Sequence, residues 1–141
     1  MATGESIIRH DAVAKVTGRA EYTQDLFKSH MLVAKYLRST IAHGRVTDID
    51  VSSARSLPGV AAVFTFKDVP RQPFATAGHP MSLDAAHRDV ADRRLLTGDI
   101  RFLGDEIAVV VAENELIARN ALKLIRVTCT SFPALIHPVD I

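Results

Sequence analysis

The sequence has almost no cysteine and no tryptophan: Cys129 is the single cysteine among 141 residues. One cysteine cannot form an internal disulfide, so the chain needs no oxidising compartment and a cytoplasmic location is expected. Cys129 lies in the alternating stretch RVTCTS, where no basic residue flanks it closely to lower its pKa. A buried structural thiol is therefore favoured, and a thiol-dependent enzyme is the weakest functional hypothesis.

Strong charge and long apolar runs are also missing. Seventeen Lys and Arg against sixteen Asp and Glu give a formal net charge of +1, which is too small to predict a nucleic-acid or anionic membrane partner. The adjacent pair Arg93-Arg94 has acidic neighbours and is expected in a solvated turn. The longest apolar run is six residues, 107–112, whereas a membrane-spanning helix needs about 20. The N-terminal stretch MATGESIIRHD lacks the apolar segment of a secretory signal.

The composition that remains is that of an ordinary globular protein. Hydrophobic residues make up 48% of the chain and charged residues 23%, and this length suits a single domain covering residues 1–141. The first strand–helix–strand pattern begins with an alternating strand at 45–51. Ser52 or Ser53 can cap a short helix that Pro58-Gly59 ends, and a β-branched strand follows at 60–66.

A second strand–helix–strand pattern lies near the C-terminus. The strand at 106–112 is continuously apolar, which is typical of a strand covered on both faces. Asn114 is the expected N-cap of the helix in ENELIARNALKLI, and the strand RVTCTS returns after it. Val110 in the strand and Leu122 in the helix are predicted core residues.

Three further segments complete the predicted organisation. MLVAKYLRS, residues 31–39, is expected to form a strand, and AEYTQD a short one. Residues Arg71 to Arg94 show no sustained period and are predicted to form one long loop. Loops of that length in a small domain are often functional or bound to a partner.

The stretch RHDAVAKVTGRAEYTQD, residues 9–25, resembles a phosphate cradle only in composition. A phosphate-binding loop needs glycines ahead of its lysine and a helix after it, but here Gly18 follows Lys15. The residues instead suit a structural role. Gly18 permits a turn, Tyr22 packs its ring inward, and Asp25 accepts backbone hydrogen bonds.

Histidines raise a metal hypothesis that their spacing does not support. His79 and His87 lie in the long loop near Asp84, Asp89 and Asp92, but a spacing of eight suits neither one helical face nor a zinc ligand pair.

Catalytic patterns are equally weak. His43 is expected in a turn without an orienting partner, and Ser39 lacks a strained nucleophile elbow. Asp48 and Asp50 alternate onto one strand face that is expected to be solvated. The sequence therefore predicts no catalytic, cofactor-binding or metal-ligating residue in this chain.

Four short motifs become informative through their order. Together they resemble the N-terminal α/β-hammerhead domain of the molybdenum-cofactor subunit in the xanthine dehydrogenase and aldehyde oxidase family, over nearly all of the chain. The stretch HRDVADRRLL is similar to bacterial xanthine dehydrogenases. The four motifs are RHDAVAKVTGRAEYTQD, YLRSTIAHGRVTDID, LPGVAAVFTFKDVP and RFLGDEIAVVVAENELIARNALKLIRV.

The resemblance implies an α+β fold with a mixed sheet, two strand–helix–strand units and one long loop. Asp11, Lys15, Gly18, Tyr22 and Asp25 would form its opening segment. It also implies a parent oxidoreductase that hydroxylates purines, other N-heterocycles or aldehydes with oxygen from water. Electrons in such enzymes pass from molybdenum-molybdopterin through two [2Fe–2S] clusters to FAD on other domains or subunits.

The resemblance places the cofactor outside the hammerhead domain. No family active-site residue can be transferred, because the cofactor-contacting loops and the late glutamate base have no counterpart here. The end at PALIHPVDI favours an excised domain over a separately encoded fragment. Expected partners are the remaining domains of the molybdenum subunit and the iron–sulfur and FAD subunits, with self-association through a surface left bare. The alternative is a free-standing module that binds a small ligand or protein through the Arg71–Arg94 loop.

Overall fold

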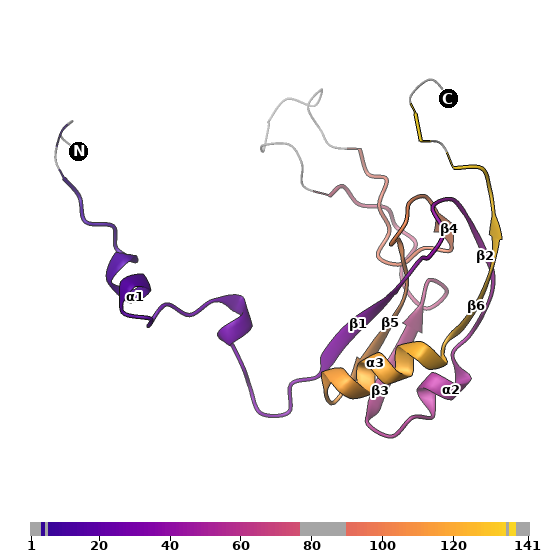
Figure 1. The fold of residues 1–141 in the computed structure, drawn as a ribbon, viewed down its shortest axis with the longest axis horizontal. Coiled ribbons are helices and arrows are strands. Elements are labelled where there is room, and N and C mark those ends of the chain that lie inside the picture. The colour runs from indigo at the N-terminus through magenta and orange to yellow at the C-terminus, as the bar shows by residue number, and fades with distance from the viewer. Residues whose placement is uncertain (1–3, 5, 77–89, 135, 138–141) are drawn as a thin grey trace. The chain divides into compact units, whose positions relative to one another are not determined.

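The computed structural model describes residues 4, 6–76, 90–134 and 136–137. Contacts within the chain divide it into two units, residues 1–31 and residues 32–141, which are described separately (Figure 1). The assignment of residues 1–141 to one domain stays a prediction. In the part of the chain that is described, no helix combines the length and apolar character that crossing a bilayer requires.

The first unit contains the one-turn helix α1 (Ala12–Val16) and the 3-10 helix η1 (Thr23–Asp25). Gly18 follows α1 with a φ of 69°, which confirms the predicted turn. The Asp25 carboxylate accepts a hydrogen bond from the Tyr22 amide at 2.9 Å, also as predicted. That bond closes a helical turn, so the prediction of a short strand in AEYTQD is wrong. The Tyr22 ring is exposed, so the prediction that it packs inward is wrong too.

The second unit contains two three-stranded sheets. In the first sheet, β5 (Glu106–Ala112) is the central strand between β1 (Val33–Arg38) and β3 (Val60–Thr65). Both neighbours run antiparallel to it. No residue of β5 is exposed, which confirms that this apolar run is a strand covered on both faces.

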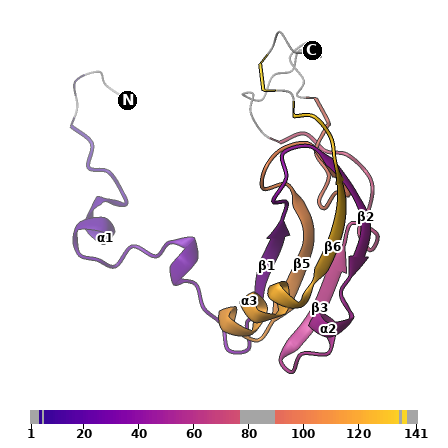
Figure 2. The same cartoon turned by 45° about the vertical axis from the view of Figure 1, so that its right-hand side comes forward.

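The second sheet has the order β4–β2–β6, with β4 (Asp99–Ile100), β2 (Gly44–Asp50) and β6 (Arg126–Ser131). Figure 2 shows β2 and β6 side by side along most of their length. Their antiparallel register shifts between Val46 and Asp48, where β2 carries an irregularity. The two-residue strand β4 is not anticipated by the sequence pattern.

The two helices of this unit begin at different kinds of cap. In α3 (Glu115–Leu124) the Asn114 side chain accepts the Ile117 amide at 2.9 Å, which confirms the predicted N-cap. In α2 (Ser52–Arg55) neither serine caps the helix; the Asp50 carboxylate accepts the Ser52 amide instead. Gly59, with a φ of 84°, lies in the turn that leads from α2 to β3.

Helix α3 packs on the first sheet and on α2 (Figure 1). Ala118 and Ala121 are fully buried beneath it, and their small side chains let the helix lie close to the strands. Val110 is fully buried as predicted, while Leu122 is partly buried against the core. A second cluster contains Val46, Ile100 and Ile107. The first cluster consists of Val51, Ala54, Val63, Ala108, Val110, Ala112, Ala118, Ala121 and Ile125.

The α+β class and the two strand–helix–strand units are confirmed, with a change in how the strands pair. Each strand–helix–strand pattern crosses from one sheet to the other, since β2 and β3 lie in different sheets, as do β5 and β6. The strands named here therefore pair only antiparallel, in two sheets rather than one mixed sheet. In the expected long loop, residues 77–89 lie outside the described residues.

Candidate functional site

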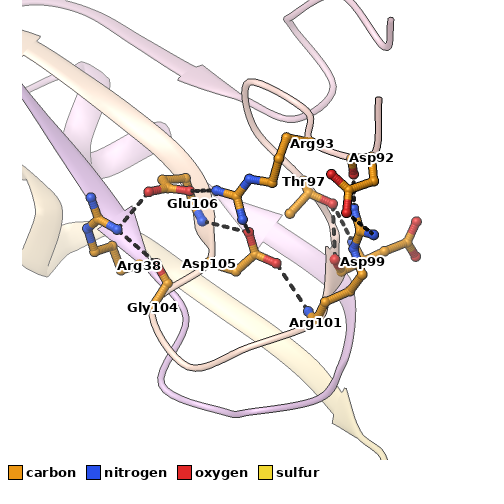
Figure 3. A network of polar contacts seen from close by, with 9 residues as sticks. All are labelled: Arg38, Asp92, Arg93, Thr97, Asp99, Arg101, Gly104, Asp105 and Glu106. Atoms are coloured by element: carbon orange, nitrogen blue, oxygen red, sulfur yellow. Dashed lines mark hydrogen bonds and ion pairs between the residues drawn. The ribbon is translucent and has the colours of Figure 1, made fainter. Parts of the chain in front are cut away.

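A polar network joins the loops that flank the start of β5, and Figure 3 shows it from close by. It connects β1, the C-terminal end of the Arg71–Arg94 loop and the loop between β4 and β5. Its members are Arg38, Asp92, Arg93, Thr97, Asp99, Arg101, Gly104, Asp105 and Glu106.

Glu106 lies between two arginines from distant parts of the sequence. Arg38 Nη1 donates to Glu106 Oε1 at 2.6 Å and to the Gly104 carbonyl at 3.0 Å. Arg93 Nη2 donates to the other carboxylate oxygen at 2.9 Å. One carboxylate thus ties an edge strand and the returning loop to the central strand (Figure 3).

Asp105 is the most buried acid of the network, with 4% of its surface exposed. Its carboxylate accepts the backbone amides of Arg101 at 3.1 Å and Glu106 at 3.2 Å, and Arg93 Nη1 lies 3.9 Å away. A buried carboxylate is tolerated when amides and a counter-charge replace its water shell. Among the described residues, no buried side-chain nitrogen or oxygen lacks a hydrogen-bond partner.

Arg101 and Phe102 extend the network toward the loop surface. Arg101 Nη2 donates to the Asp92 carbonyl, and its Nη1 lies 4.0 Å from the Asp92 carboxylate. The Arg93 guanidinium lies 4.8 Å from the centroid of the Phe102 ring, within the range of a cation–π contact. These contacts fix the loop conformation, and the acids involved are engaged by arginines or backbone amides. The arrangement suits a positioning element rather than acid–base chemistry.

The sequence did not anticipate this network. Arg93 is half-buried between two carboxylates, so its predicted place in a solvated turn is wrong, whereas Arg94 is exposed as expected. Neither a helical nor a strand period links position 93 to its partners Asp105 and Glu106, so sequence periodicity could not pair them. Two adjacent acids at the start of an apolar strand were the available signal.

Ser39 and His43 each contact a backbone carbonyl. The Ser39 hydroxyl donates to the Ile41 carbonyl at 2.7 Å, which is a local turn contact. One His43 ring nitrogen, Nδ1, lies 2.7 Å from the Pro133 carbonyl oxygen, and the ring packs edge-on against Phe132. His43 lies in a bend before β2, as expected, but the prediction that it lacks an orienting partner is wrong, because the Pro133 carbonyl and the Phe132 ring hold its imidazole.

Asp48 and Asp50 are both exposed on β2, as predicted. The Ser52 backbone amide, which donates to Asp50 at 2.9 Å, lowers the pKa of that carboxyl. Asp50 therefore serves as a capping group for α2, and its lowered pKa is the opposite of what a general acid needs.

Cys129 lies on β6 and is exposed, so the prediction of a buried thiol is wrong. Strand β6 is an edge strand whose side chains, apart from Val127, are exposed. Partial burial still raises the pKa of the Cys129 thiol. A raised pKa leaves less of the reactive thiolate near neutral pH, which argues against a thiol-dependent enzyme.

Metal ligation finds no donor set in the described ranges 4, 6–76, 90–134 and 136–137. Within them, no group of three or more His, Cys, Asp or Glu side chains could hold a metal ion. His79, His87, Asp84 and Asp89 lie outside the described residues. The expectation that the molybdenum cofactor is held by other domains stays a prediction.

Two hollows flank the network. One has a volume of about 250 Å³ and is lined by Arg45, Arg71 and Arg94 together with Phe66 and Leu96. Arg45 and Arg94 both pair with Asp99 across it. The other hollow, of about 410 Å³, is more apolar and lies between the 101–103 loop and the segment after β6.

These features define an α+β domain with two antiparallel sheets, a helix that covers one of them and a loop network of paired charged groups. The family described as "Aldehyde oxidase and xanthine dehydrogenase, a/b hammerhead domain" matches residues 17–132. The chain belongs to this family, whose members form part of the large subunits of molybdenum hydroxylases. The predicted resemblance and fold class are thereby confirmed.

Individual relatives agree with this assignment. The chain is 52% identical over 131 residues to the xanthine dehydrogenase molybdenum-binding subunit of Escherichia coli O157:H7, covering 93% of this chain and 17% of the relative. It is 38% identical over 124 residues to the probable hypoxanthine oxidase XdhD of the same strain, covering 88% and 13%. The crystal structure of quinoline 2-oxidoreductase from Pseudomonas putida 86 superposes with a TM-score of 0.76 at 35% identity, covering 92% and 16%. The chain thus spans less than a fifth of the length of these relatives.

Proposed function

We propose that this chain is the hammerhead scaffold domain of a molybdenum hydroxylase of the xanthine dehydrogenase type. The complete enzyme would hydroxylate a purine, another N-heterocycle or an aldehyde with oxygen from water. The observation that carries the proposal is the 52% identity over 131 residues to a xanthine dehydrogenase molybdenum-binding subunit. The self-contained loop network supports it, because its charged groups are engaged in holding the fold.

The cofactors of the proposed enzyme lie outside this chain. Molybdenum-molybdopterin would be held by the remaining domains of the molybdenum subunit, and the [2Fe–2S] clusters and FAD by other domains or subunits. Catalytic, cofactor-binding and metal-ligating residues are assigned to those parts, and the assembly is placed in the cytoplasm. Only a substrate class is proposed, because the names of the relatives refer to different heterocycles, namely xanthine, hypoxanthine and quinoline.

The test is a domain exchange in the E. coli O157:H7 relative. Its 131 matched residues are replaced by their counterparts from this chain, and the chimeric subunit is produced with the host's own partner subunits. Xanthine-dependent dye reduction and stoichiometric molybdenum are expected in the chimera. The 141-residue chain alone should contain no stoichiometric molybdenum by elemental analysis. An inactive chimera, or a metal-loaded isolated chain, contradicts the proposal.

The alternative is a binding module that uses the Arg71–Arg94 loop, whose described ends line the hollow of about 250 Å³ through Arg71 and Arg94. Calorimetry of the 141-residue chain with xanthine and hypoxanthine separates the two functions. Heat of binding without any partner would favour the module, and its absence is expected here.

A further inference from the structure

Three arginines line one hollow of the second unit, which has a volume of about 250 Å³. We call it the arginine hollow and define it by the lining residues Arg45, Phe66, Arg71, Arg94, Leu96 and Asp99. Three positive side chains against one negative side chain give it a formal charge of +2, whereas the whole chain has only +1. A concave surface with an excess of one charge and apolar walls attracts ions of the opposite sign.

Asp99 orients two of these arginines and leaves most of their donors unused. Arg45 lies opposite Asp99 across the β2–β4 ladder, and its Nε donates to Asp99 Oδ1 at 2.8 Å. Because this bond uses Nε, the two terminal amino groups of Arg45 remain available to a ligand. Arg94 Nη1 lies 3.7 Å from Asp99 Oδ2, which is within the range of an ion pair but too long for a hydrogen bond.

The third arginine is not engaged at all by the described part of the chain. Among the described residues, Arg71 has no hydrogen-bond or ion-pair partner. The acids nearest to the hollow in sequence are bound elsewhere. Asp68 accepts hydrogen bonds from Thr65, and Asp92 pairs with Arg101 at 4.0 Å. Neither acid lines the hollow, so the described side chains leave its excess positive charge uncompensated.

The wall behind the arginines is apolar and held in place. Leu96 is 3% exposed, and the Phe66 ring packs so closely on Gly98 that a Cβ there would lie 2.8 Å from a ring carbon. The Thr97 hydroxyl donates to the Asp99 carbonyl at 3.1 Å and accepts the Asp99 amide at 3.0 Å (Figure 3). The segment that carries Asp99 is therefore ordered before a ligand binds, which lowers the conformational cost of binding.

We propose that the arginine hollow binds a phosphate dianion, either free or as the monoester of a small molecule. A phosphate monoester carries a charge of about −1.5 to −2 at pH 7, which matches the charge of the hollow. The planar guanidinium group places its N–H donors as phosphate oxygens require, and all the cations that line the hollow are arginines. The apolar wall leaves room for a small group attached to the phosphate.

The shape of the site favours a small molecule over an acidic polypeptide. Small-molecule sites are concave and combine apolar walls with a few polar groups that fix the orientation of the ligand. A stable protein contact needs a much larger area, of about 1,000 Å² or more. The proposal goes beyond the scaffold function and does not depend on it, because every residue it uses lies in this chain.

The binding experiment is made on the 141-residue chain with three probes. Equilibrium dialysis measures radiolabelled inorganic phosphate, and calorimetry measures phenyl phosphate, with phenol as its neutral control. Saturable binding of both phosphates and no binding of phenol are expected. Tighter binding of phenyl phosphate identifies a monoester as the preferred form, whereas equal affinities identify free phosphate. Affinity should also rise with pH through about pH 6, where phosphate loses its second proton.

Arg119 provides a matched control for Arg45. The Arg119 side chain is 65% exposed and pairs with Glu115 at 2.6 Å, while that of Arg45 is 66% exposed and pairs with Asp99 at 2.8 Å. Arg119 lies on α3 and does not line the hollow. Arg45→Gln and Arg119→Gln therefore remove the same charge and an equivalent ion pair, but only Arg45→Gln changes the site.

Arg45→Gln and Arg71→Gln should each weaken phosphate binding by about tenfold, because each removes a charge-assisted hydrogen bond. Arg119→Gln should stay within about twofold of the unsubstituted chain, since salt screens exposed charges outside the site. Arg71→Gln breaks no contact among the described residues, so a loss of binding there does not arise from unfolding. Unchanged urea midpoints check this for all three variants.

Four outcomes would overturn the proposal. They are an absence of saturable phosphate binding, binding of phenol as tight as that of phenyl phosphate, equal affinities of Arg45→Gln and Arg119→Gln, and affinity that does not rise with pH. Equal affinities of the two variants would mean an adventitious ion only.

Dialysis of the chimeric E. coli enzyme then tests whether the site is open in a complete enzyme. An active chimera that binds phosphate, and loses that binding with Arg45→Gln, supports the proposal. An active chimera that gains no phosphate binding over the E. coli enzyme shows that polypeptide covers the hollow, and overturns it. An inactive chimera counts against the scaffold function alone, because the titrations of the 141-residue chain stand without it.

Discussion

The two units of the chain use similar apolar residues in opposite ways. In the first unit, Val13 is 61% exposed and Val16 is 83% exposed, and neither helical element contains a buried residue. In the second unit, Val110 is fully buried between neighbouring strands and under a helix. The contrast teaches that residue type alone does not decide burial. A second layer of structure must be present to cover the side chain.

Hydrogen bonding shows the same contrast. The five-residue helix α1 depends on local contacts such as the ion pair of Asp11 with Lys15 at 2.8 Å. A helix of one turn gains little from its own backbone bonds because nucleation is unfavourable. The ten-residue helix α3 has an N-cap and a buried face. Two substitution pairs compare the two units directly, and two further tests examine contacts within the second unit.

The largest effect is expected in the core of the first sheet. Val110→Ala should lower the free energy of unfolding by about 2–4 kcal/mol, because it removes two buried methyl groups and leaves a cavity. Val13→Ala in α1 should leave the urea midpoint unchanged, since that side chain is already in water. Equal midpoints for the two variants would show that β5 is not the centre of the core.

The second-largest loss of stability is expected in the polar network around Arg93. Arg93→Met leaves the carboxylates of Asp105 and Glu106 without their shared counter-charge, and should cost about 1–3 kcal/mol. Arg9→Met removes an exposed pair with Asp11 and is expected to have no measurable effect in urea unfolding. If Arg93→Met matches the wild-type protein, the network does not hold the loops.

The N-cap of α3 should contribute less. Asn114→Ala removes the acceptor for the Ile117 amide and should cost about 1 kcal/mol in urea or thermal unfolding. Asn120→Ala in the exposed middle of the same helix is the matched control and should be neutral or slightly stabilising. An equal loss of stability at both positions would show that the effect comes from replacing any asparagine of the helix and not from removing its N-cap.

The smallest effect is a pH dependence from Asp68. Hydrogen bonds from the Thr65 hydroxyl and amide, both 2.7 Å, lower the pKa of Asp68 below its ordinary value of 3.8. A lowered pKa in the folded state gives stability that is complete well above pH 3.8 and is lost as the pH falls through the folded value. The difference in urea midpoint between the wild-type protein and Asp68→Asn should therefore shrink on acidification. A difference that grows toward low pH would reverse the assigned sign.

Local patterns predicted the elements of the second unit well. The continuous apolar run at 106–112, the asparagine before the helix and the alternating strand at 126–131 each depend on neighbours in sequence, and each element forms as expected. The cap of α2 was missed because the Asp50 carboxylate competes successfully with Ser52 and Ser53. In the first unit, the Asp25 side chain closed a helical turn where a strand was expected.

The polar network depends on contacts between residues far apart in the sequence, so local sequence patterns could not predict it. Arg38 meets Glu106 across 68 positions, and Arg93 meets it across 13. Cys129 is exposed because β6 is an edge strand, which depends on sheet order rather than on the alternation of RVTCTS.

By itself, the sequence determined the family through the order of four motifs, and it determined most strands and helices through periodicity and capping residues. These signals come from neighbouring residues or from the order of motifs along the chain, so the sequence alone is enough to detect them. Only the tertiary structure decided that the strands divide into two antiparallel sheets and that Arg93 is enclosed by two carboxylates. It also decided that apolar residues of the 101–103 loop and of the segment after β6 line one hollow. Those features arise from contacts between segments far apart in the chain, and such contacts form only when packing brings the segments together.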